Sequence, residues 1–227
     1  MTFNLSKQTM IIIGILFILV ILIFVFTRKS EKFSPSMYSY NLYVSPAAAS
    51  TKFKFEDVEN LIQSMQLAQQ PSFGIIMIDS NIPSPYHARL MISDGPVVIS
   101  NDFFCEYPPD VFTMLPEIIA KYPPSALGGE SENEYKCYIE VSPIITTLLF
   151  SIDEINLLIV AYQIIGPEIE PQTIQIVNTI PEPYNAKIIR TDGMGVTIGQ
   201  DILFGKDPSR FCYQVNSLAS KVWDPTY

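Results

Sequence analysis

The sequence has few of the residue types that build catalytic and metal centres. Histidine occurs once, as His87, and the three cysteines, Cys105, Cys137 and Cys212, show no Cys-x-x-Cys spacing. A structural zinc site needs closely spaced thiols or imidazoles, so no metal and no other cofactor is expected. A Cys-His dyad stays open as an alternative, because its partners meet only in the folded chain.

Phosphate-binding and nucleophile motifs are also missing. Neither G-x-x-x-x-G-K-[ST] nor G-x-S-x-G occurs. Gly193, Gly195 and Gly199 approach the dinucleotide-binding pattern, but the third glycine comes one position late and the residues before it favour a strand. A hairpin turn is therefore predicted there. The acidic residues 128–134 lack the Asp/Asn-Gly pattern of a calcium loop and are predicted to form a solvated surface.

Positive charge is scarce beyond the N-terminal region. The whole chain has a net charge of −9, and the part from residue 33 onward, with 10 basic and 22 acidic residues, has a net charge of −12. Phosphate backbones repel such a domain, so nucleic acid is not expected as a partner. The odd number of widely separated cysteines is typical of free thiols in a reducing compartment.

What the sequence does contain is an uncharged apolar run at residues 10–26. As a helix this run is about 26 Å long, close to the ~30 Å hydrocarbon core of a bilayer. It predicts a transmembrane helix and a single-pass membrane protein, with the lipid bilayer as one partner. The predicted anchor residues are Met10, Ile13, Leu16, Leu19, Leu22 and Phe26. Arg28 and Lys29 form the membrane flank and favour a large domain that faces the cytosol.

Four segments are predicted along the chain. They are a short N-terminal segment (1–8), the transmembrane helix (9–27), an extended aromatic-rich tether (28–50) and an acidic β-rich globular domain (51–227). Disordered linkers are usually poor in aromatic residues, so the tether is expected to bind something. The candidate interface residues are Tyr38, Tyr40 and Tyr43 in the tether and Trp223 near the C-terminus.

The globular domain reads as short apolar stretches punctuated by proline and glycine. A helix is predicted over residues 55–70, and hairpins over 89–100 and 187–198. Residues 155–165 suit a central strand but are long enough for a helix, and 211–215 are predicted as a strand. No internal repeat is predicted. The predicted fold class is an N-terminal single transmembrane helix plus a mainly-β (α+β) domain, an antiparallel β-sandwich or barrel-like domain with one packed helix.

The N-terminal anchor, the aromatic-rich tether and the acidic β-rich domain without a catalytic signature together resemble the membrane-anchored minor capsid proteins of large icosahedral double-stranded DNA viruses. The resemblance concerns architecture and transfers no site residues. It implies a non-enzymatic structural protein that links a membrane, such as the internal membrane of a virion, to structural proteins of a capsid or scaffold. Two alternatives stay open: a membrane-tethered enzyme with an unrecognised site, and an envelope or cell-surface binding protein.

Overall fold

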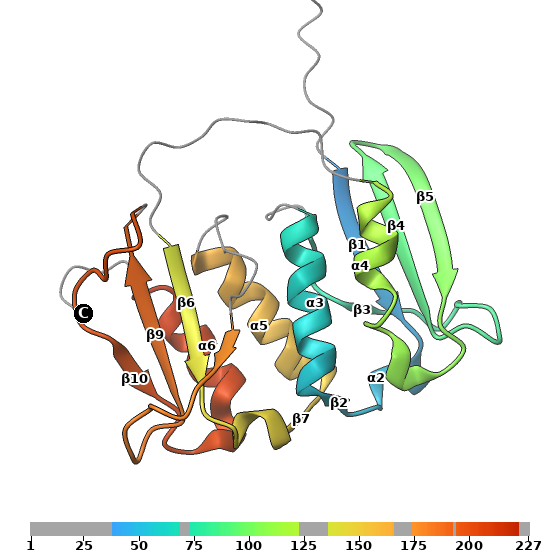
Figure 1. Ribbon diagram of the computed structural model, residues 1–227. Coiled ribbons are helices and arrows are strands. Elements are labelled where there is room, and N and C mark those ends of the chain that lie inside the picture. Colours follow the sequence, from blue (N-terminus) through green and yellow to red (C-terminus); the bar gives the residue numbers. More distant parts are fainter. Residues whose placement is uncertain (1–37, 69–72, 123–135, 166–173, 193, 223–227) are drawn as a thin grey trace, which may run out of the picture. The chain divides into compact units, whose positions relative to one another are not determined.

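The fold contains two four-stranded mixed sheets, each built from one of two consecutive halves of the chain (Figure 1). The computed structural model describes residues 38–68, 73–122, 136–165, 174–192 and 194–222. All of these residues belong to one compact unit, residues 37–227. Part of the predicted tether therefore lies inside the folded unit, because its first strand begins at Tyr38.

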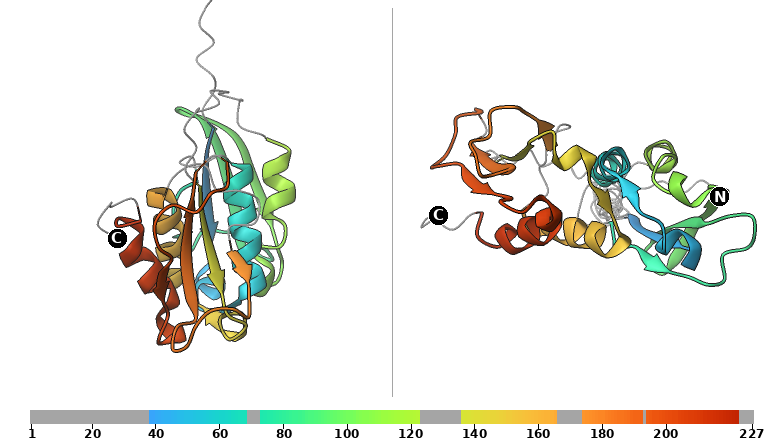
Figure 2. Two further views of the ribbon diagram at one scale, coloured as in Figure 1. Left: turned by 60° about the vertical axis from the view of Figure 1, so that its left-hand side comes forward. Right: turned by 90° about the horizontal axis from the view of Figure 1, so that it is seen from below.

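The first half of the unit runs from β1 to α4. Its elements are β1 (Tyr38–Val44), α2 (Pro46–Ala49), β2 (Phe53–Lys54), α3 (Phe55–Leu67), β3 (Met77–Ile78), β4 (Ala88–Asp94), β5 (Val97–Phe104), the 3-10 turn η1 (Pro108–Asp110) and α4 (Leu115–Ala120). The strand order in its sheet is β3-β1-β4-β5. β3 runs parallel to β1, and the other neighbours are antiparallel. Helices α3 and α4 lie on one side of this sheet (Figure 2).

The second half repeats this succession of elements. They are β6 (Lys136–Val141), the 3-10 turn η2 (Ile145–Thr147), β7 (Leu149–Phe150), α5 (Ile152–Ile165), β8 (Ile174–Ile176), β9 (Ala186–Thr191), β10 (Ile202–Phe204), the 3-10 turn η3 (Pro208–Arg210) and α6 (Phe211–Ala219). The strand order is β8-β6-β9-β10, with β8 parallel to β6 and the other neighbours antiparallel. Each strand thus has the same place in its sheet as its counterpart in the first half.

The sequence repeats along with the topology, so the prediction of no internal repeat is wrong. Val44, Ser45 and Pro46 at the end of β1 correspond to Val141, Ser142 and Pro143 at the end of β6. The segment Pro-Tyr-His-Ala that leads into β4, residues 85–88, corresponds to Pro-Tyr-Asn-Ala, residues 183–186, which leads into β9. Identical residues are few, and the longest matches lie at the ends of strands, where the backbone turns.

The first strand of each half, β1 and β6, has alternating buried and less buried side chains. In β1, Tyr40 and Leu42 are fully buried while the residues between them are half-buried. In β6, Cys137 and Ile139 occupy the equivalent inward positions. A period of two places one set of side chains against the helices and leaves the other set on the outer face.

The predicted fold class is wrong. The described residues form an α+β structure with five α-helices, two separate four-stranded mixed sheets and a two-stranded sheet of β2 and β7, whereas an antiparallel sandwich or barrel with one packed helix was expected. The main source of the error is α5. Seven of its residues are buried, from Ile152 to Ile165, so it needs an apolar surface on most sides. Such a continuous apolar run is also what a central strand requires, and periodicity does not separate the two. The predicted strand at 211–215 is likewise helical and forms part of α6.

The prediction of a single-pass membrane protein is also contradicted. In the described residues, no helix is long and apolar enough to cross a bilayer. The segment predicted to do so, 9–27, lies outside the described residues.

Two predicted local elements are confirmed. The helix predicted over 55–70 is α3, with Glu56 and Asp57 in its first turn. The hairpin predicted over 89–100 is formed by β4 and β5. These elements follow from local signals, namely acidic residues at a helix start and a turn sequence between two apolar runs.

Removing the Tyr162 hydroxyl is expected to stabilise the protein. Tyr162 on α5 is 1% exposed, and its hydroxyl has no hydrogen-bond partner among the described residues. Because a buried unpaired hydroxyl costs about 1–3 kcal/mol, Tyr162→Phe should raise the free energy of unfolding by about 1 kcal/mol. Urea denaturation would measure the change.

Tyr40→Phe is the matched control, because the Tyr40 hydroxyl donates a hydrogen bond to the carbonyl of Tyr122. This variant should lower the free energy of unfolding by about 1 kcal/mol. Equal losses in the two variants would contradict the difference between a paired and an unpaired hydroxyl.

Candidate functional site

The single histidine lies at a junction where β1 ends and β4 begins. The Ser45 hydroxyl lies 2.8 Å from His87 Nδ1 and accepts a hydrogen bond from the backbone N–H of Ala48, at the start of α2. The Ser45 N–H donates to the His87 carbonyl over 2.8 Å. Ser45 therefore joins the end of one strand, the start of the next and the short helix α2.

Cys105 belongs to the same junction. The His87 N–H donates to the Cys105 carbonyl over 3.0 Å. Cys105 has a φ of 58°, a left-handed conformation that no other non-glycine residue adopts in the described part of the chain. Burial raises the pKa of the Cys105 thiol to about 11, so the thiolate that a nucleophilic cysteine needs is scarce at neutral pH. The structure thus brings a serine, a histidine and a cysteine together, but not as an activated dyad.

The second half contains the same junction with different chemistry. Ser142 replaces Ser45, and its hydroxyl donates to Asn185 Oδ1 over 3.0 Å. The Asn185 side chain also donates to the carbonyl of Gly205 over 2.8 Å. Asn185 stands at the place of His87, and Gly205 at the place of Cys105. An amide and a glycine cannot perform acid-base or nucleophilic chemistry, yet the hydrogen bonds between the serine and the residue at the place of His87 persist, so the junction fastens strands together.

The other two cysteines are buried in the second half. All three cysteines are free, as predicted. Burial raises the pKa of Cys137 to about 12 and also raises the pKa of Cys212. No group of three His, Cys, Asp or Glu side chains in the described residues is placed to hold a metal ion. The predicted acidic loop, 128–134, lies outside those residues.

The predicted interface residues have different environments. Tyr40 is fully buried, so its side chain is not available to a partner. Tyr38 and Tyr43 are half-buried, and the Arg89 guanidinium lies 4.8 Å from the centre of the Tyr43 ring. Trp223 lies outside the described residues. The predicted anchor and flank residues lie outside them as well: Met10, Ile13, Leu16, Leu19, Leu22, Phe26, Arg28 and Lys29.

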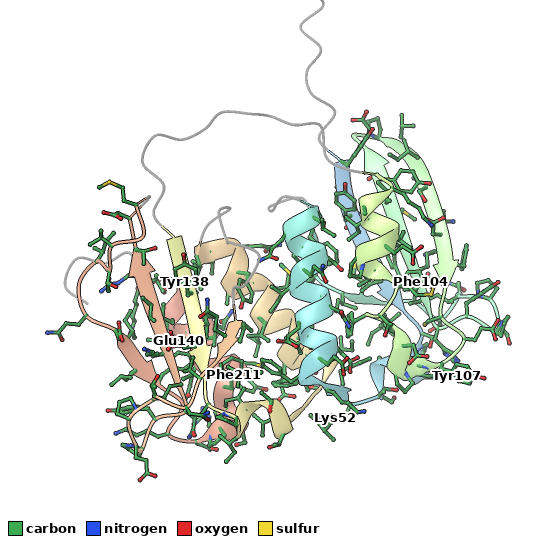
Figure 3. All side chains as sticks on the ribbon, viewed as in Figure 1. Lys52, Phe104, Tyr107, Tyr138, Glu140 and Phe211 are labelled. Atoms are coloured by element: carbon green, nitrogen blue, oxygen red, sulfur yellow. The ribbon has the colours of Figure 1, made fainter. Side chains whose placement is uncertain are left out.

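The outer faces of the two sheets carry paired charges. In the first sheet, Arg89 forms a salt bridge with Asp79. In the second sheet, Lys187 Nζ lies 2.9 Å from a carboxylate oxygen of Glu140, which is labelled on β6 in Figure 3, and 3.4 Å from one of Asp201. The charges on these faces are paired within each sheet, although Arg89 Nε has no hydrogen-bond partner among the described residues.

The outer edge of the first sheet is different. Val97, Val98 and Ile99 at the start of β5 are 58%, 52% and 39% exposed. Among the described strands, β5 has only β4 as a neighbour. A slip in register between Ile92 and Ser93 of β4 leaves one extra residue in this part of β5. An edge strand with consecutive exposed apolar residues is a template for another chain.

The second sheet has an equivalent but more irregular edge. Met194 and Val196, in the turn between β9 and β10, are 87% and 58% exposed. Beside β10 a pocket of about 410 Å³ is lined in part by Tyr184, Lys206 and Gln214. Both hairpin turns lie at the upper end of Figure 1.

The hairpin predicted over 187–198 differs in the structure, where Thr197 forms an isolated bridge with Thr191 and the strand that pairs with β9 is β10. In the hairpin of β4 and β5, the apolar residues after the turn were not predicted to be a site. The available signal was three consecutive apolar residues next to a turn, in place of the expected alternation with polar residues.

Comparison with known protein families, curated proteins and solved structures found no match.

A pair of substitutions at the junctions tests whether Cys105 is a strained structural residue. Gly205 has a φ of 80°, and a Cβ there would lie 3.3 Å from the Ala186 backbone nitrogen. Gly205→Ala should therefore lower the free energy of unfolding by about 1–2 kcal/mol.

Cys105→Gly removes the strain of a side chain at positive φ, but it also removes a small buried side chain. Its free energy of unfolding should change by less than about 1 kcal/mol. Thermal unfolding of both variants would compare the two junctions. A loss for Cys105→Gly as large as that for Gly205→Ala would contradict the structural equivalence of these positions.

Proposed function

We propose that this protein is a non-enzymatic structural component that binds another protein through the outer edge of its first sheet. The observation that carries this proposal is the exposed run Val97, Val98 and Ile99 on the edge strand β5. The partner contributes an extended segment that adds to β5 as a further strand.

The chemistry of an edge strand supports this mode of binding. Backbone groups on the outward side of β5 have no neighbouring strand in the described part of the chain, so an added strand would supply their hydrogen bonds. Side chains alternate between the two faces, so Val97 and Val98 flank the edge on opposite sides. A partner with apolar residues at alternate positions on both faces would bury them.

The junctions support the non-enzymatic part of the proposal. The cluster of Ser45, His87 and Cys105 recurs in the second half as Ser142, Asn185 and Gly205. Its cysteine has a pKa of about 11, far from what a thiolate nucleophile requires. The resemblance to minor capsid proteins names the kind of partner, another structural protein of a shell or scaffold.

A photo-crosslinking side chain placed at Val98 should capture the partner directly. We expect benzoylphenylalanine at this position to form one dominant adduct in cells that contain the native assembly, and Val98→Asp to prevent incorporation into that assembly. Tyr213 on α6 is the matched control position, because it is 50% exposed and lies away from β5. Mass spectrometry would identify the adduct. Equal adduct formation at both positions would contradict an interface at β5.

Replacing the junction of the first half by that of the second tests the absence of catalysis. The double variant His87→Asn and Cys105→Gly removes the imidazole and the thiol but retains an equivalent structural arrangement. It should fold and enter the assembly as the unaltered protein does, as measured by sedimentation of the assembled particles. Loss of assembly with intact folding would argue for a chemical role of these residues.

A further inference from the structure

We infer that residues 38–122 and 136–222 are two copies of one unit that bind each other as a two-fold dimer about an axis between Phe53 and Phe150. Each half is thus the protein partner of the other. The inference is independent of the proposed function, because it concerns the inner surfaces of the two halves and not the outer edge at β5.

Several backbone hydrogen bonds at the strand ends correspond in the two halves, although the His87 N–H donates to the Cys105 carbonyl and the Asn185 N–H donates to the Phe204 carbonyl. The Ser45 N–H donates to the His87 carbonyl over 2.8 Å, and the Ser142 N–H donates to the Asn185 carbonyl over 2.9 Å. These residues are 97 and 98 positions apart in the chain.

The sheet registers agree with this spacing. Val44 of β1 pairs with Ala88 of β4 and with Ile78 of β3. Val141 of β6 pairs with Ala186 of β9 and with Ile176 of β8. One register error would break this agreement, because it would move the paired residue to the other face of the sheet.

The helices that follow the first strands also correspond. The Lys54 N–H donates to the Asp57 carboxylate over 2.6 Å at the start of α3, and the Ser151 N–H donates to the Glu154 carboxylate over 2.8 Å at the start of α5. Four buried pairs line the two helices at matched positions: Val58 and Ile155, Leu61 and Leu158, Ile62 and Ile159, and Met65 and Tyr162.

The pairing of β2 with β7 locates the axis. These two strands are counterparts, and they pair antiparallel with Phe53 opposite Phe150 and Lys54 opposite Leu149. Phe53 and Phe150 are equivalent residues, 97 positions apart, so a residue faces its own copy. In an isologous interface only residues at the two-fold axis do so. Both rings are buried, at 0% and 2% exposure.

Further contacts hold the halves together across this axis. Asn156 of α5 accepts a hydrogen bond from the Ile76 N–H over 2.8 Å and donates one to the Ile76 carbonyl over 3.1 Å. Lys52, labelled in Figure 3, lies 3.6 Å from the Glu154 carboxylate. The side chain of Asn156 thus makes the pair of backbone hydrogen bonds that a neighbouring strand would make to Ile76, which directly precedes the edge strand β3.

Exchanging the order of the halves tests the two-fold relation. The new chain would contain every native residue in the order 1–37, 135–222, 123–134, 38–122 and 223–227. If the halves are two-fold copies, each new connection spans the same distance as the native one. We expect a monomer with an unchanged far-UV circular dichroism spectrum and cooperative thermal unfolding. A control joins the same segments with one boundary moved by about ten residues, which removes the equivalence, and should not fold. An unfolded or aggregated order-exchanged chain would overturn the inference.

Cleavage of the full-length protein tests whether the halves are partners. A protease recognition sequence inserted between Gly128 and Gly129 allows the folded chain to be cut. We expect the two fragments to elute together in size-exclusion chromatography at the mass of the uncut protein. In the cut protein, Asn156→Ala should raise the dissociation constant of the fragments about tenfold, because the paired amide contacts are lost. Val98→Ala on the outer edge is the matched control and should leave that constant unchanged. Fragments that separate after the cut, or equal effects of the two variants, would overturn the inference.

Discussion

The contact between Phe53 and Phe150 is the constraint on which the arrangement of this protein depends. Two residues of β2 pair with two residues of β7, and this short ladder joins halves that otherwise have separate sheets. The Phe53 ring also packs against Phe112 of its own half, with 4.8 Å between ring centres. The pairing of β2 with β7 is therefore continuous with the apolar core of the first half.

The composition of α5 follows from this position. Seven of its residues are buried, and Asn156 uses its side chain to satisfy the backbone of Ile76 in the other half. A helix that packs on its own sheet and also borders a second half has little surface left for solvent. Its polar side chains are few, and at least one of them serves the contact between the halves.

The repeated architecture also separates structural from chemical roles. A serine, a histidine and a cysteine in contact invite a catalytic interpretation when they are seen once. The second half places a serine, an asparagine and a glycine in the same positions, with hydrogen bonds of 3.0 and 2.8 Å. Shared geometry with different chemistry indicates that the geometry is what both halves need. The outer edges differ: Val97 on β5 is 58% exposed, whereas Ile202 and Phe204 on β10 are buried.

Local signals in the sequence determined the helix α3, the hairpin of β4 and β5, and the free state of the cysteines. The helix and the hairpin depend on residues close together in the chain, namely acidic residues in a first turn and a glycine between apolar runs, whereas the cysteines were predicted to be free because they are few and widely separated. The internal repeat was also present in the sequence, in the segments around Ser45 and Ser142, but few residues are identical. Only the tertiary structure decided that residues 152–165 form a helix and that Tyr40 is buried. It also decided that Phe53 faces Phe150. The physical reason is that an apolar run indicates how much surface must be buried, but the residues that bury it lie in a distant part of the chain and are known only from the fold.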